Sequence, residues 1–252
     1  MNSKTYEVYD KLNPPVEEAF KVLRTNIQFC SPEKRIKSLT VVSSNPREGK
    51  TSISINLAIS IARSGTKVLL VDADLRKPML IKRLGGKDFI GLSTFLNGDA
   101  SLAEIICNTS IENLSYISCG PKPHNPSELI GSAVFATFIK TLEEIYDMVI
   151  IDTSTLGSVI DSAIIASQTD GTVIVIASRT VPVEKAKRLK EQLENANASI
   201  LGVVLNKVNK RDYKAYKSDF NNFYYFNNFG DTGKYEKGKF KKLKKNEVTY
   251  HD

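Results

Sequence analysis

The chain has 252 residues, 41% of them hydrophobic and 25% charged, with a formal net charge of +7 at pH 7. These values suit one soluble α/β domain with some chain left over as a tail. No stretch approaches the roughly 18 apolar residues that span a bilayer, and residues 1–10 lack the apolar core of a secretory signal, so we expect a cytoplasmic protein. The cysteines, Cys30, Cys107 and Cys119, show no paired metal-ligand spacing and are expected to be free thiols.

The positive charge is concentrated at the C-terminal end. Residues 209–252 contain eleven Lys and Arg against six Asp and Glu, whereas the rest of the chain is close to neutral. The same segment is rich in Lys, Asn, Gly and Tyr and has no hydrophobic periodicity, which predicts a flexible tail. We therefore expect three parts: an N-terminal helical region over residues 1–35, a core over residues 36–208 and the tail over residues 209–252.

Ahead of the tail, hydrophobic periodicity predicts a helix and then strands that alternate with helices. Residues 16–29 carry an apolar stripe at helical spacing, after two prolines that are tolerated at a helix start. The expected strands are residues 38–43, 67–71, 114–118, 148–151, 172–177 and 200–205; the expected helices are residues 50–64, a long one from Asn125 or Ser127 to about Tyr146, and residues 182–195. This order predicts an α/β fold with a mostly parallel sheet covered by helices on both faces.

The segment from Ser43 to Thr51 lies between an expected strand and an expected helix, which is the setting of a phosphate-binding P-loop. Backbone N–H groups and the helix dipole both favour anions there. Lys50 would neutralise β- and γ-phosphate charge, and the Thr51 hydroxyl would ligate Mg²⁺. The expected nucleotide-binding residues are Ser44, Asn45, Pro46, Arg47, Glu48, Gly49, Lys50, Thr51 and Ser52. The alternative is a chance Gly-Lys-Thr sequence before a helix.

Two residues depart from the usual pattern G-x-x-x-x-G-K-[ST]. Ser44 takes the place of the first glycine, and Arg47 stands where related loops commonly have glycine. If residue 47 needs a positive φ, arginine costs about 1–2 kcal/mol there. If it does not, Arg47 can add a phosphate contact, and the sequence leaves both possibilities open.

Two further elements place carboxylates at strand ends. Asp72 and Asp74 follow an apolar strand, and Asp152 follows the apolar run of residues 148–151. Ligands of open α/β sheets bind at this edge, and a strand continuing through residues 72–74 would place the first two carboxylates on one side. One would help hold Mg²⁺ through water and the other would orient or deprotonate a hydroxyl, while Asp152 suits an outer-sphere Mg²⁺ contact. The alternative for the pair is a solvated charged turn.

These elements, in this order, resemble the bacterial tyrosine kinases of capsule and exopolysaccharide clusters, in the form whose cytoplasmic kinase is separate from its membrane partner. The resemblance spans about residues 14–208. It rests on Ser-Asn-Pro-Arg-Glu-Gly-Lys-Thr at 44–51, Asp-Ala-Asp-Leu-Arg-Lys-Pro at 72–78, Asn-Pro-Ser-Glu-Leu at 125–129 and Asp152-Thr153. The second motif is the most specific. Ser154 and Thr155 stand where the family usually has two prolines, which leaves the shape of that loop open.

The resemblance implies a P-loop NTPase fold and an ATP- and Mg²⁺-dependent protein-tyrosine kinase. The implied catalytic residues are Lys50, Asp72, Asp74 and Asp152, and the implied Mg²⁺ ligands are Thr51, Asp72 and Asp152. Asp72 would be the base that orients or deprotonates the tyrosine hydroxyl. Asn206 follows the last strand, at a position where related P-loop ATPases contact the adenine.

The resemblance also implies assembly and regulation. Glu18, Lys21 and Arg24 resemble the family's E-x-x-R-x-x-R oligomer motif, with lysine replacing the middle arginine; an ordinary exposed helix face is the alternative. The tail tyrosines Tyr213, Tyr216, Tyr224, Tyr225, Tyr235 and Tyr250 would be autophosphorylation sites, although a sticky tail that binds RNA or an acidic surface is the alternative. The implied partners are a membrane-anchored activator that recruits the kinase to the membrane, a cognate tyrosine phosphatase and other copies of the chain. No nucleic-acid partner is expected.

Two other functions share these motifs. Partitioning and cell-division ATPases have the same three phosphate-site elements, but they usually carry a lysine where this chain has Asn45. A non-enzymatic scaffold that uses nucleotide only to switch its assembly is the second. The substitutions at Arg47 and at Ser154 and Thr155 keep it open.

Overall fold

A computed structural model of the protein describes residues 5–6, 8, 12–31, 35–80, 90–156, 160–209 and 212. The chain divides into two units, Met1–Lys207 and Val208–Asp252. Almost all of the second unit, including the predicted tail tyrosines, lies outside the described residues.

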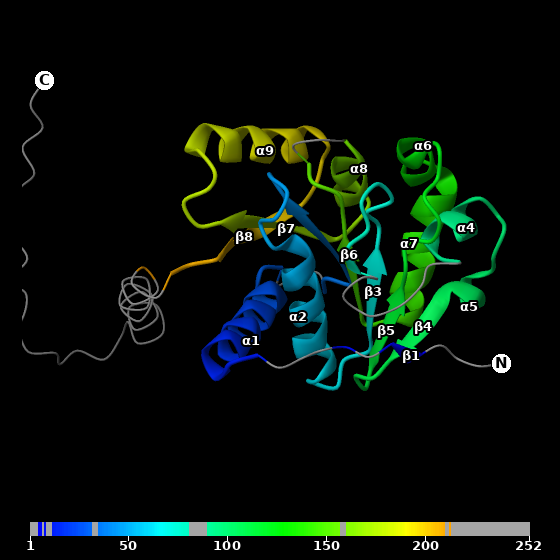
Figure 1. Ribbon diagram of the computed structural model, residues 1–252, viewed down its shortest axis with the longest axis horizontal. Helices are drawn as coiled ribbons and strands as arrows, with labels where there is room; N and C mark the ends of the chain where they lie inside the picture. The colour runs from blue at the N-terminus through cyan, green and yellow to red at the C-terminus, as the bar shows by residue number, and fades with distance from the viewer. Residues whose placement is uncertain are drawn as a thin grey trace, which may run out of the picture. The chain divides into compact units, whose positions relative to one another are not determined.

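The centre of the first unit is one sheet with the strand order β1-β4-β5-β3-β6-β2-β7-β8 (Figure 1). All neighbouring strands run parallel except β4 and β5, which are antiparallel. Their bounds are β1 Thr5–Tyr6, β2 Ser38–Ser43, β3 Val68–Asp72, β4 Ile106–Thr109, β5 Leu114–Ile117, β6 Met148–Asp152, β7 Gly171–Ala177 and β8 Ile200–Asn206. The six strands expected from the sequence are all present, and the mostly parallel sheet is confirmed.

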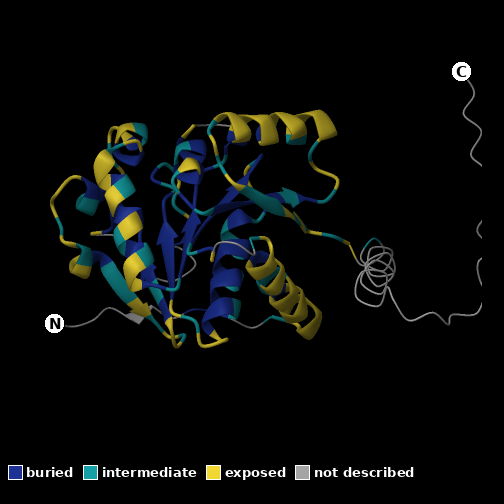
Figure 2. Cartoon of the chain, turned by 180° about the vertical axis from the view of Figure 1, so that it is seen from behind, coloured by how far each residue is buried: buried dark blue, intermediate teal, exposed yellow. Residues whose placement is uncertain are grey.

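Helices cover both faces of this sheet, as expected from the apolar strands. Their bounds are α1 Pro14–Phe29, α2 Lys50–Ala62, α4 Leu92–Leu96, α5 Leu102–Ile105, α6 Pro126–Ile130, α7 Ala133–Ile145, α8 Asp161–Ser167 and α9 Val183–Asn195. Buried residues gather in the central strands and α2, and the exposed residues lie on the outer sides of the helices (Figure 2).

Strand β3 shows how the sequence produces these two layers. Val68 and Leu70 pack in a cluster with α1 and α2, whereas Leu69 and Val71 pack in a cluster with α4, α6 and α7. Successive strand residues point to opposite faces, so a strand covered on both sides needs a continuous apolar run. A third cluster joins β2 and β7 to α8 and α9.

The structure corrects the expected long helix between residues 125 and 146. There are two helices, α6 and α7, separated at Gly131 and Ser132. The Ser132 hydroxyl accepts the Phe135 N–H at 3.2 Å, which caps the start of α7. Because serine competes for backbone donors in this way, it favours a new helix start over a continuous helix. Asn125 is the first cap residue of α6, but its side chain makes no capping hydrogen bond.

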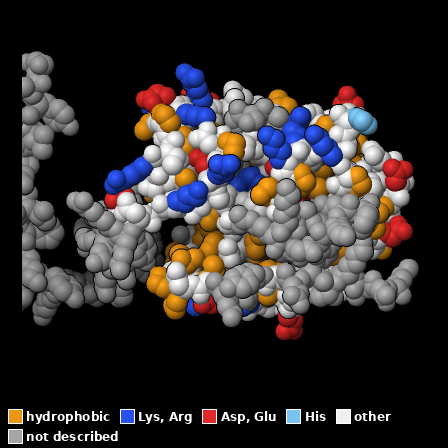
Figure 3. Space-filling view, viewed as in Figure 1, with side chains coloured by type: hydrophobic (Ala, Val, Ile, Leu, Met, Phe, Trp, Pro, Cys, Tyr) orange, Lys and Arg blue, Asp and Glu red, His pale blue; other side chains and the backbone are white. Residues whose placement is uncertain are grey.

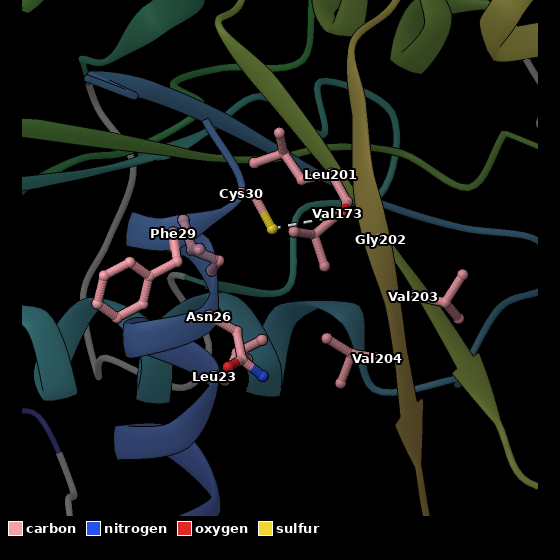
Figure 4. A pocket seen from close by; sticks show the side chains of 10 residues that line it. Leu23, Asn26, Phe29, Cys30, Val173, Leu201, Gly202, Val203 and Val204 are labelled. Atoms are coloured by element: carbon pink, nitrogen blue, oxygen red, sulfur yellow. Dashed lines mark hydrogen bonds between the residues drawn. The ribbon is translucent and has the colours of Figure 1, made fainter. Parts of the chain in front are cut away.

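At one side of the sheet, β8 is the last described strand and α1 ends beside it. An apolar groove lies between them, lined by side chains that include Leu23, Phe29 and Val204 (Figure 4). The Cys30 thiol donates to the Leu201 carbonyl oxygen across this groove at 3.6 Å. Among the residues that the structure describes, no helix combines the length and the apolar character needed to cross a bilayer.

Candidate active site

The P-loop connects β2 to α2 at the carboxyl edge of the sheet. Gly49 begins α2 with φ +99°, in the left-handed region that favours glycine. A Cβ atom at Gly49 would also lie 2.1 Å from Nδ2 of Asn206. Position 49 therefore excludes larger residues for two independent reasons, and the P-loop turn predicted from the sequence depends on it.

Three contacts hold the rest of this loop. The Asn206 amide donates to the Glu48 carbonyl oxygen at 2.8 Å, and the Lys207 ammonium donates to the Arg47 carbonyl oxygen at 2.6 Å. The Glu48 carboxylate accepts the Asn45 N–H at 2.7 Å, and Glu48 is buried. The end of β8 thus fixes the P-loop backbone. Asn206 lies beside the phosphate loop, as required of a nucleotide-binding residue, and its contact with adenine stays a prediction.

Arg47 decides one question that the sequence left open. Its φ is +66°, in the left-handed region, where a side chain costs about 1–2 kcal/mol. The Arg47 side chain is exposed at the turn, so the loop accommodates its length. The strain is in the Arg47 backbone, which has the positive φ.

We expect the substitution Arg47→Gly to stabilise the protein by about 1 kcal/mol, because glycine adopts this φ without a steric penalty. Urea denaturation of the two proteins at neutral pH measures the difference. The matched control is Arg63→Gly, because Arg63 has φ −63° at the end of α2 and gains nothing from a left-handed preference. An Arg47→Gly protein that is less stable than the parent would contradict the strain.

Asp152 lies at the centre of the site. Its Oδ1 accepts the Lys50 ammonium at 2.8 Å, and its Oδ2 accepts the Thr51 hydroxyl at 2.7 Å. The Ser54 hydroxyl, one turn further along α2, also donates to Oδ1 at 2.9 Å. The Lys50 and Asp152 side chains are almost fully buried, so the ion pair between them offsets the large cost of removing both charges from water. Lys50, Thr51 and Asp152 are thus brought together as expected. Ser54 was not foreseen, although its spacing of four from Lys50 places both on one helix face.

Asp72 ends β3 directly opposite Asp152 on β6 in the register of the sheet. It is fully buried, and its Oδ2 has no hydrogen-bond partner among the described residues. Burial, reinforced by the nearby Asp152 carboxylate, raises the pKa of Asp72 well above its usual value, although Lys50 opposes this shift. The site therefore holds a buried carboxyl group with a free oxygen beside a lysine and a hydroxyl.

Asp74 does not lie on a continuation of the strand, the arrangement that would have placed it on the same side as Asp72. The strand ends at Asp72, so the two carboxylates are not related by strand alternation. Asp74 instead begins a turn, where its Oδ1 accepts the N–H groups of Arg76 at 3.3 Å and Lys77 at 3.0 Å. Burial raises the pKa of Asp74, while the Lys77 N–H opposes the rise. The residue lies beside the site, held by its own turn.

A second polar network adjoins this turn. Arg76 donates to the Asp161 carboxylate through Nε at 2.7 Å and through Nη2 at 3.3 Å, and also to the Ser127 hydroxyl at 2.8 Å. Ser127 in turn donates to Asp161 at 2.7 Å. This network joins the motif at 72–78 to the motif at 125–129, which the sequence had identified separately. The sequence did not indicate Asp161, because an Asp in the first position of a short apolar helix has no distinctive local pattern.

Comparison with known proteins identifies the family. Residues 39–229 match the CobQ/CobB/MinD/ParA nucleotide binding domain. The chain is 40% identical to tyrosine-protein kinase CpsD of Streptococcus agalactiae, over 77% of this chain and 84% of that protein. It is 36% identical to putative tyrosine-protein kinase CapB of Staphylococcus aureus, over 80% and 88% of the two chains. The chain belongs to the bacterial tyrosine kinase family.

Solved structures agree with this assignment. The chimerical protein CapA2B2 superposes with a TM-score of 0.75 at 34% identity, covering 82% of this chain and 96% of that one. The kinase domain of Escherichia coli tyrosine kinase ETK superposes with a TM-score of 0.74 at 32% identity, covering 77% of this chain and 76% of that one. The septum site-determining protein MinD of Pyrococcus horikoshii, in complex with Mg-ADP, superposes with a TM-score of 0.58 at 26% identity, covering 69% of this chain and 72% of that one. The P-loop NTPase fold expected from the motifs is thus confirmed, and nucleotide binding is supported.

The three residues that resemble the family's oligomer motif all lie on α1. Glu18 and Lys21 form an exposed ion pair of 3.3 Å on α1. Arg24 turns toward the protein instead, and its Nη1 donates to the Ser60 carbonyl oxygen at 2.6 Å. The three side chains therefore do not form one network within the chain. Their role in assembly stays a prediction, as do the three expected parts of the chain.

Ser154 occupies the loop that follows Asp152, where a proline is usual in this family. Its carbonyl oxygen accepts the Ser162 hydroxyl at 2.6 Å, and the two hydroxyl oxygens lie 3.1 Å apart. Thr153 donates to the Val41 carbonyl oxygen at 2.8 Å. These buried hydroxyl groups fix the loop by hydrogen bonds, so the loss of proline does not leave it without support.

Proposed function

We propose that this bacterial tyrosine kinase transfers the γ-phosphoryl group of ATP to tyrosines, including those of its own tail. The observation that carries the proposal is the buried Asp72, which has a partnerless oxygen and lies opposite Asp152 beside the P-loop. The Asp72 Oδ1 accepts the Asp74 N–H at 3.2 Å, but Oδ2 is buried without a donor, which costs free energy. Such a cost is expected where the group serves a reaction.

The residues fit a Mg²⁺–ATP complex. Lys50 is a cation at the helix start, and it would leave its contact with Asp152 to bind phosphate oxygens. The Thr51 hydroxyl would likewise leave its contact with Asp152 to bind Mg²⁺. Asp152, freed from both, would hold the ion, and Asp72 would help to hold it through water, which leaves its Oδ2 open to the acceptor hydroxyl. Mg²⁺ usually takes one or two carboxylates and completes its shell with phosphates and waters. When bound, the ion would neutralise the charge that develops on the transferred group.

Asp72 would act on the acceptor. Its raised pKa, caused first by burial, makes the ionised carboxylate a stronger base than an exposed aspartate. Its free Oδ2 would accept the hydroxyl proton of a tyrosine as the tyrosine oxygen bonds to the γ-phosphorus. The bond from that phosphorus to the β–γ bridging oxygen would break, and ADP would leave. Lys50 would meanwhile counter the negative charge of the phosphates. Lys and Arg side chains gather over the upper half of the face in Figure 3, near α9 and the loops that follow the strands, and would favour anionic nucleotide.

We propose the following cellular setting from the family membership. The kinase would act in capsular or exopolysaccharide biosynthesis beside a membrane-anchored activator, which would recruit it to the inner face of the membrane. A cognate tyrosine phosphatase would reverse the modification. Copies of the chain would assemble through Glu18, Lys21 and Arg24, with the first two exposed on α1 and thus accessible to a second copy. Assembly would let the tail of one copy reach the site of another.

Incubation of the purified chain with Mg-ATP, with and without the activator, tests the proposal. We expect phosphotyrosine in residues 209–252, located by mass spectrometry, because this segment holds six of the ten tyrosines. Changing those six to Phe should reduce autophosphorylation at least about 10-fold while an external tyrosine peptide is still phosphorylated. Tyr146→Phe, at a buried tyrosine, is the matched control and should not reduce the signal.

A different result would favour the other function that the fold allows. ATP hydrolysis without phosphotyrosine under all of these conditions would contradict the proposal. It would instead support a partitioning or cell-division type of ATPase, or a scaffold that nucleotide switches.

A further inference from the structure

Helix α8 contacts the two loops that follow the proposed active-site carboxylates Asp72 and Asp152. Its first residue, Asp161, binds Arg76 in the turn that follows Asp72. The next residue, Ser162, binds Ser154 in the loop that follows Asp152. Asp161 is 3% exposed, although no phosphate-site motif includes it. Two adjacent helix residues therefore tie together the loops at the ends of β3 and β6.

Arg76 transmits the position of Asp161 to Asp74. The Arg76 backbone N–H donates to the Asp74 carboxylate, while its guanidinium is held by Asp161 and Ser127. The double contact between a guanidinium and a carboxylate fixes direction as well as distance. Burial would raise the pKa of Asp161, but hydrogen bonds from Arg76 and Ser127 outweigh it and lower that pKa. Asp161 is therefore charged at neutral pH and holds Arg76 as an ion pair.

We infer that Asp161 is a positioning residue of the phosphotransfer site, which acts through Arg76 on the turn that holds Asp74. The inference rests on the proposed kinase function. A small displacement of a reacting group can cost about 100-fold in rate. Asp161 thus affects the chemical step without touching substrate. A merely structural Asp161 would affect stability and leave the turn and the chemical step unchanged in the folded protein.

The test compares Asp161→Asn, Arg76→Gln and the double variant in the full-length chain. We expect each single change to lower kcat about 10- to 100-fold, with less than about a 3-fold change in the KM for ATP. The double variant should be no slower than Arg76→Gln alone, because Asp161 acts only through that side chain. Hydrogen exchange of residues 73–80, followed by mass spectrometry, should be at least about 10-fold faster in Asp161→Asn, since the Arg76 and Lys77 amides lose protection.

Asp147→Asn is the matched control. It removes the same charge at the opposite end of β6, where Asp147 pairs with exposed Arg35, and it should change neither kcat nor the exchange of residues 73–80. Ser127→Ala offers a milder change if Asp161→Asn folds poorly, and it should give the same effects to a smaller degree.

The inference is overturned if Asp161→Asn folds and keeps parental kcat, or if its effect adds fully to that of Arg76→Gln. Failure of the kinase function looks different, because the parent chain would then form no phosphotyrosine. The exchange of residues 73–80 would still decide whether Asp161 holds the turn, and unchanged exchange would overturn the inference by itself.

Discussion

Replacing Lys50 with methionine should lower tyrosine phosphorylation at least about 1,000-fold, because the variant loses the buried cation that would face the phosphates. In the protein, this cation is 2.8 Å from Asp152 and both side chains are almost fully buried. Methionine retains the length and the apolar stem but offers no charge. Transfer of labelled phosphate to the tail and to an external peptide, at saturating ATP, measures the loss.

The same variant should keep its fold. Asp152 loses an ion-pair partner but still accepts hydroxyl hydrogens from Thr51 and Ser54, so we expect a loss of roughly 3 kcal/mol and no collapse of the sheet. Lys67→Met is the matched control, because Lys67 lies at the other edge of the sheet over the Tyr146 ring. Undiminished phosphotyrosine in folded Lys50→Met would exclude this site as the centre of phosphotransfer.

The sequence predicted which charged side chains meet at the carboxyl edge of the sheet, while their roles toward nucleotide stay predictions. Lys50, Asp72 and Asp152 belong to different elements, yet parallel strands deliver their carboxyl ends to one edge. Once three apolar strands were recognised, the meeting of these side chains followed. The direction of Asp74 did not follow, because it depends on where β3 stops. Two more residues of strand would have placed the Asp74 carboxylate on the strand face instead of in a turn.

The features that the sequence did not indicate depend on short or distant interactions. Strands β1 and β4 have two and four residues, too few for hydrophobic alternation to be visible. The break between α6 and α7 depends on whether Ser132 caps a helix or continues one. Asp161 becomes meaningful only when α8 lies beside the turn that carries Arg76, a contact across 85 residues of sequence. Local propensity carries no information about such a contact.

Replacing Asp72 with asparagine should abolish activity and stabilise the fold. Without the carboxylate that would accept the tyrosine proton, we expect kcat to fall about 100-fold or more. The stability change has a separate cause. Asparagine fills nearly the same volume but removes a charge that is fully buried, faces Asp152 and has one oxygen without a partner. We expect a gain of about 1–2 kcal/mol at neutral pH, which corresponds to roughly 3–6 °C in Tm.

The gain should depend on pH in a defined direction. Burial raises the pKa of Asp72 in the folded state, so between the unfolded and folded pKa values the native protein binds the extra proton. The free energy of unfolding then falls as pH rises through that window. Asparagine does not titrate, so the free energy of unfolding of the Asp72→Asn variant does not fall for this reason. The advantage of Asp72→Asn should therefore be smallest near pH 4, grow as pH rises and level off once Asp72 is ionised in the folded parent.

Thermal unfolding from pH 4 to pH 8, without nucleotide or Mg²⁺, measures this difference. Asp147→Asn is the control for the chemical change itself, because the Asp147 side chain pairs with Arg35 and is 45% exposed, and this change should not stabilise the protein at any pH. A Tm advantage of Asp72→Asn that shrinks with rising pH would mean that Asp72 is ionised at low cost in the folded state. Asp72 would then not be a buried, basic carboxylate at the end of β3. An advantage that grows with pH, together with lost phosphotransfer, would show that the chain retains Asp72 for its chemistry at the expense of stability.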